Sequence, residues 1–89
     1  MPRLTPSLYA LALRVGEMVE SIPFDDSKTR EIFHLTNEDG PWYIQKNNLD
    51  GLVEVFVRIG HHTFHVYESP YPTDSPNIVE YNNLVIDVA

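Results

Sequence analysis

Residues 52–68, with the sequence LVEVFVRIGHHTFHVYE, decide the fold of this chain. In the first half of this stretch, the β-branched residues Val53, Val55 and Val57 occupy every second position, and charged or aromatic residues lie between them. Because successive side chains of a strand point to opposite faces, this alternation predicts a strand over 52–59 with one face buried.

The residues after this strand predict that it forms a hairpin with the next strand. Gly60 and His61 form a two-residue turn, and 62–68 make the returning strand. This register matches apolar residues on the core side and places Phe56 opposite His65 on the other side. The predicted cross-strand pairs are Val57 with Phe64, Val55 with Val66, Phe56 with His65, Arg58 with Thr63, and Glu54 with Tyr67.

The N-terminal segment predicts an amphipathic helix. Thr5 is a suitable N-cap, and Pro6 suits the first helical position, where its missing N–H costs nothing. Pro23 disfavours helical geometry at the residue before it, so the helix should end between Glu20 and Ile22. Apolar residues recur at spacings of three and four and form one stripe, namely Leu8, Leu11, Ala12, Val15, Val19 and Ile22.

Four further strands are predicted with less regular patterns. Dense turn signals at 37–41 and 47–51 separate the first two from their neighbours. Asn82 and Asn83 form either a tight hairpin or a bulge within one longer strand. These strands cover 30–36, 42–46, 78–81 and 84–88. The fold expected for 1–89 is a single α+β domain, with one N-terminal amphipathic helix packed on one face of a four- to six-stranded, mostly antiparallel sheet.

Composition limits the classes of partner. The 89 residues contain no cysteine, which excludes disulfides and thiolate chemistry. The 13 acidic and 6 basic residues give a net charge of -7, which disfavours direct contact with nucleic acid or an anionic membrane and favours a partner with a basic surface. Solubility alone is the simpler explanation of this acidity. The N-terminal apolar run is too short to cross a membrane and lacks a signal-peptide cleavage site, so we expect a soluble, cytoplasmic protein.

The residues that carry chemistry form no recognisable catalytic or cofactor motif. His61, His62 and His65 lie close in sequence to Glu68 and Asp74, which makes a divalent-metal protein or hydrolase one alternative. On a hairpin, however, His62 and His65 point to opposite faces. The serines lack a nucleophile elbow and the glycines form no phosphate loop. We therefore assign no catalytic, metal or cofactor residue.

Aromatic residues on the sheet face away from the helix are the stronger functional signal. One helix covers only one face, which leaves Phe56, His65 and Tyr67 exposed, together with Trp42 or Tyr43 from the preceding strand. The proline-rich segment 69–77 either contacts a partner or folds across these residues. The predicted partner-binding residues are Phe56, His65, Tyr67, Tyr71, Trp42 and Glu54.

These observations favour a small, acidic, non-enzymatic protein-binding module. It would act as a regulator or stoichiometric inhibitor of a larger protein with a basic surface, including nucleic-acid-processing proteins. The second hypothesis is a structural subunit that forms a homodimer through its sheet face or a strand edge. The metal-binding protein or hydrolase is the third.

Overall fold

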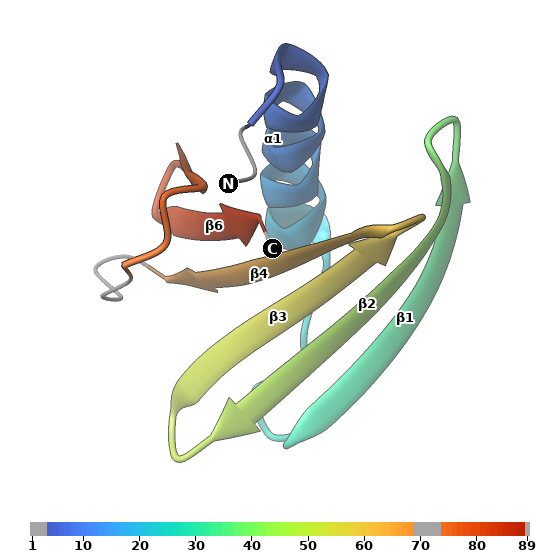
Figure 1. The fold of residues 1–89 in the computed structure, drawn as a ribbon. Helices are drawn as coiled ribbons and strands as arrows, with labels where there is room; N and C mark the ends of the chain where they lie inside the picture. The colour runs from blue at the N-terminus through green and yellow to red at the C-terminus, as the bar shows by residue number, and fades with distance from the viewer. Residues whose placement is uncertain (1–3, 69–73, 89) are drawn as a thin grey trace.

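The computed structural model describes residues 4–68 and 74–88 and has an α+β architecture, as predicted (Figure 1). One helix packs against an open sheet of six antiparallel strands. The elements are α1 (Pro6–Ser21), β1 (Arg30–Asn37), β2 (Gly40–Leu49), β3 (Leu52–Ile59), β4 (His62–Glu68), β5 (Ile78–Tyr81) and β6 (Leu84–Val88). No helix in these ranges is both long and apolar enough to cross a membrane.

Both ends of α1 follow the local sequence. The Thr5 Oγ1 accepts a hydrogen bond from the Leu8 N–H at 3.1 Å, and Pro6 occupies the first turn. At the other end, Ile22 is extended before Pro23, and its N–H bonds to the Val19 carbonyl. The predicted helix boundaries are therefore confirmed.

The sheet has the strand order β1-β2-β3-β4-β6-β5. Every predicted pair of the β3–β4 hairpin is present, including Phe56 with His65. β2 is longer than predicted, because Asn47 and Asn48 continue its pairing with β3. The turn is thereby reduced to Asp50 and Gly51, both with positive φ (54° and 83°), as a tight two-residue hairpin requires.

The last two strands also form a tight hairpin. β5 and β6 pair antiparallel over their whole length, and Asn82 takes a positive φ of 51° in the turn between them. Asparagine tolerates this conformation better than most residues, so the hairpin is adopted and the alternative of a bulge within one strand is not.

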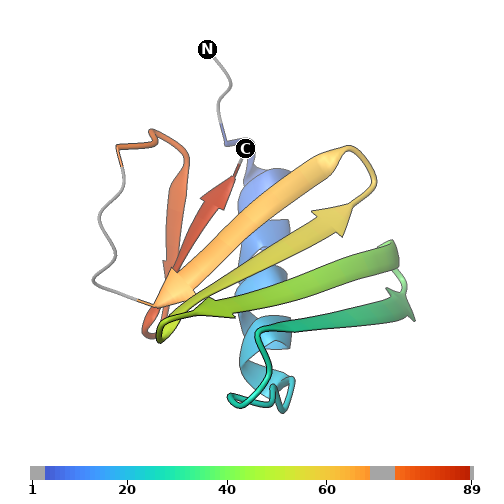
Figure 2. The same cartoon turned by 90° about the horizontal axis from the view of Figure 1, so that it is seen from below.

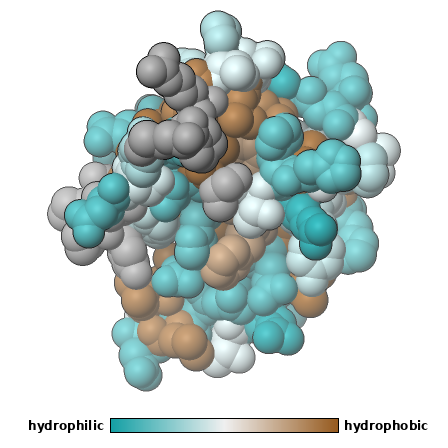
Figure 3. Space-filling view, viewed as in Figure 1, coloured by the Kyte–Doolittle hydropathy of each residue, from teal (hydrophilic) through white to brown (hydrophobic). Residues whose placement is uncertain are grey.

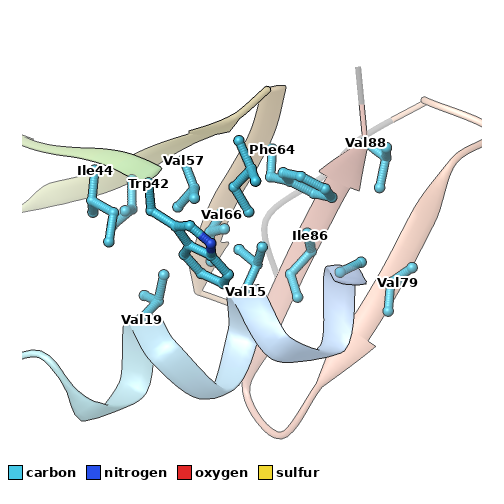
Figure 4. Close-up of a cluster of buried hydrophobic side chains, with 13 residues drawn as sticks. Val15, Val19, Trp42, Ile44, Val57, Phe64, Val66, Val79, Ile86 and Val88 are labelled. Carbon is cyan, nitrogen blue, oxygen red and sulfur yellow. The ribbon is translucent and has the colours of Figure 1, made fainter. Parts of the chain in front are cut away.

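The core lies between α1 and one face of the sheet (Figure 2). The helix packs mainly on β4, β5 and β6. Val15 and Val19 of the helix belong to one buried cluster with Phe64 and Ile86 of the sheet (Figure 4). Trp42 belongs to the same cluster and is only 2% exposed. Burial of these side chains is the main stabilising contribution to the fold.

Lys46 is a buried lysine on the helix side of the sheet, where it contacts the loop between α1 and β1. Lys46 is 1% exposed, and its ammonium donates hydrogen bonds to the carbonyls of Asp25 (2.8 Å) and Lys28 (2.9 Å). The Lys46 Nζ also lies 3.6 Å from the Glu31 Oε2, which in turn accepts the Asp25 N–H at 2.8 Å. These contacts satisfy the buried charge and fix the loop between α1 and β1 on the sheet.

Candidate functional site

The candidate site is the face of the sheet opposite α1, here called the open face. Cross-strand partners share a face, so the pairing of the strands identifies its side chains. Even-numbered residues of β1 and β3 and odd-numbered residues of β2 and β4 lie on it. The open-face side chains of these strands include Arg30, Ile32, His34, Tyr43, Leu49, Leu52, Glu54, Phe56, Arg58, His65 and Tyr67.

Apolar exposure is concentrated on this face. Of the five large hydrophobic side chains that are most exposed in the described chain, Ile32 (46%), Tyr43 (38%), Leu49 (67%) and Leu52 (49%) lie there. Only Tyr9 (48%) lies on the helix. Figure 3 shows apolar surface at the tip of the β2–β3 hairpin, where the two leucines flank the turn. A folded domain normally scatters such residues, so their concentration makes this face the candidate site.

Ring contacts connect neighbouring strands across the open face. The centroids of His34 and Tyr43 lie 5.1 Å apart in an edge-to-face arrangement. Phe56 lies against His65 with centroids 4.1 Å apart, and His65 meets Tyr67 edge-on at 5.8 Å. Such contacts restrict the rotamers of these rings, so a partner that binds them loses less side-chain entropy.

The open face is far less acidic than the rest of the molecule. Arg30 and Arg58 lie on it, and the Glu54 Oε2 is 3.7 Å from the His65 Nε2. Its other carboxylates, Glu80 and Asp87, are on the last two strands. The remaining acidic residues of the described chain lie on α1, in loops, or on the helix side. The open face therefore presents apolar and aromatic groups within an acidic surround.

The predicted partner-binding residues do not all lie on the open face. Phe56, His65 and Glu54 lie on the open face, as the predicted hairpin register requires. Tyr67 points to the same face but is only 5% exposed. The placement of Trp42 on this face was wrong, because its position in β2 directs the indole into the core. Tyr71 lies outside the described residues.

Three exposed apolar residues of the open face are not among the partner-binding residues predicted from the sequence. Leu49 was assigned to a turn, although it is the last residue of β2. Leu52 begins the strand whose alternation also predicts Phe56 on the same face, so that pattern was sufficient to find it. Ile32 was assigned to a strand, but the sequence did not show which of its two faces the helix covers.

The histidines do not converge. His61 lies in the turn, His62 on the helix side of β4, and His65 on the open face. Among residues 4–68 and 74–88, no three histidines or carboxylates are grouped closely enough to hold a metal ion. The arrangement of the described histidines therefore gives no support to a metal-dependent reaction.

Comparison with known proteins does not add a function. No family model, curated protein or solved structure matches this chain. The geometry of the open face is accordingly the basis for the functional proposal.

Proposed function

We propose that this chain is a non-enzymatic protein-binding module that docks on its partner through the open face. The observation that carries the proposal is the gathering of Ile32, Tyr43, Leu49 and Leu52, all more than a third exposed, on the face that no helix covers. Exposed apolar side chains of this size gain most when a complementary surface removes them from water.

Tyr43 and Phe56 are the expected centres of the contact. Both are aromatic and both are held by neighbouring rings or strands, which limits the entropy lost on binding. Leu49 and Leu52 extend the contact toward the tip of the β2–β3 hairpin. The expected interface is therefore an apolar centre with polar groups at its margin.

The charge of the chain supports a partner with a basic surface. A net charge of -7 steers encounters with a positively charged protein, while the open face supplies the close contact. The proposed partner is thus a larger protein with an apolar patch bordered by lysine and arginine. Nucleic-acid-processing proteins belong to this class, and docking there would make the chain a regulator or stoichiometric inhibitor.

Matched variants test the proposal. Proteins retained by the wild-type chain in extracts of its native cells would be identified, purified and titrated with Tyr43→Ala, Phe56→Ala and Tyr9→Ala. Tyr9 is the matched control, because it is 48% exposed but lies on α1. We expect each open-face substitution to weaken binding by about 30-fold, the effect of a 2 kcal/mol hot spot, and Tyr9→Ala to have no effect. Equal binding by all three variants would refute the proposal.

A further inference from the structure

Among the described residues, no strand pairs with the main-chain groups on the outer edge of β1. β1 is the first strand of the sheet and pairs only with β2 within the described chain. The Asn48 N–H donates to the Thr29 carbonyl at 2.9 Å, which shows that the odd-numbered residues direct their main-chain groups toward β2. The even-numbered residues therefore direct theirs outward, and these residues are Arg30, Ile32, His34 and Thr36.

Side chains along β1 are incompletely buried on both faces of the sheet. Ile32 is 46% exposed on the open face, and Phe33 and Leu35 are only partly buried on the helix side. The strand contains no proline, no lysine and no bulge, three of the common protections of an edge, and its one inward-facing charge, Glu31, is paired with Lys46 of the same chain. By contrast, β5 at the other end of the sheet has only four residues.

The charge along β1 itself leaves room for a second copy at this edge. Two chains of net charge -7 repel each other over most of their surfaces. The open-face side chains of β1 and β2 include no carboxylate, and Glu31 is the single acidic residue of β1 itself. Pairing along β1 itself therefore brings one carboxylate of each chain, Glu31, into the contact.

We infer that two copies of this chain pair through their β1 strands, antiparallel and across a two-fold axis at Phe33. In this register Ile32 lies opposite His34 of the second copy, and Arg30 lies opposite Thr36, so all four outward-facing residues exchange main-chain hydrogen bonds. Glu31 lies opposite Leu35, and no two like charges face each other. The paired sheets become continuous, and the pairing leaves Phe56 and Leu52 uncovered.

The inferred pairing shares Ile32 with the proposed docking face, but the solution mass of the purified chain, measured without a partner, tests the pairing separately. Light scattering over a range of concentrations should give twice the mass of one chain for the wild type. Ile32→Lys should give the mass of one chain, because a lysine at the centre of the edge blocks pairing. Leu52→Lys is the matched control, since Leu52 is 49% exposed but lies on β3, and it should remain dimeric.

Hydrogen exchange locates the interface. The outward N–H of His34 should be protected in the wild type and should exchange quickly in Ile32→Lys, while the inward N–H of Phe33 stays protected in both. His34→Pro removes an outward main-chain donor and the imidazole beside Tyr43 but no main-chain bond to β2, so it should also give a folded monomer. A monomeric wild type, a dimer that survives Ile32→Lys, or loss of the dimer in Leu52→Lys would each overturn the inference.

Discussion

Removal of the buried ammonium of Lys46 should destabilise the fold strongly. Lys46→Met keeps most of the aliphatic stem but leaves the Asp25 and Lys28 carbonyls without their donor and Glu31 without its counter-charge. Breaking a buried ion pair from one side costs about 3–5 kcal/mol. The Glu31 side chain is 11% exposed and still accepts the Asp25 N–H, which places the expected loss near the lower limit, about 3 kcal/mol.

Urea unfolding measures this loss directly, because Trp42 is the single tryptophan and is buried. Lys28→Met is the matched control: it removes an exposed ammonium from the same loop and should cost less than about 0.5 kcal/mol. In a Glu31→Gln background, Lys46→Met should cost less than in the wild type, because no carboxylate is then left unpaired. Equal costs for the two lysine variants, or no dependence on Glu31, would show that the buried ion pair does not stabilise this loop.

Three smaller predictions concern contacts elsewhere in the structure. Gly16→Ala should lower the free energy of unfolding by about 1–3 kcal/mol, since a Cβ there would lie 2.9 Å from side chains of β5 and β6; an unchanged urea midpoint would contradict it. Hydrogen bonds from the Ser27 hydroxyl and N–H lower the pKa of Asp25, so Ser27→Ala should raise that pKa toward its ordinary value in an NMR titration. The stability linked to Asp25 is present above its ordinary pKa and is lost as the pH falls through the lowered value. Arg14→Met removes the bidentate pair with Asp39, whose two hydrogen bonds of 2.9 Å also raise the pKa of Arg14. The free energy of unfolding should fall by about 0.5–1 kcal/mol, and by less in high salt. A loss that does not depend on salt would contradict an ionic origin.

Local patterns made much of the fold predictable. Thr5 and Pro6 fix the start of α1 through capping and a preset φ, and Pro23 ends the helix. Each of these effects acts within one helical turn of the residue that causes it. The β3–β4 register was predictable because a shift by one residue would expose Val55 and Val57. β2 was predicted too short, since its polar end is held by pairing with β3, a contact that local propensity does not contain.

The open face was predictable only in part, for a related reason. Phe56 and His65 follow from the hairpin register alone. Whether Trp42 or Tyr43 points to the helix depends on the register between β2 and β3. The turn predicted over 47–51 is longer than the actual one, so this register could not be deduced from it. Lys46 shows the same limit: its burial depends on carbonyls from a loop 18 and 21 residues earlier in the chain.

Site-specific photo-crosslinking is the sharpest test of docking through the open face. A photoreactive phenylalanine analogue would replace Phe56 on the open face in one variant and Tyr9 on α1 in another, and both would be irradiated in extracts of the native cells. We expect a discrete adduct with a second, basic protein from position 56 and none from position 9. Adducts of equal yield from both positions, or an adduct from position 9 alone, would contradict it.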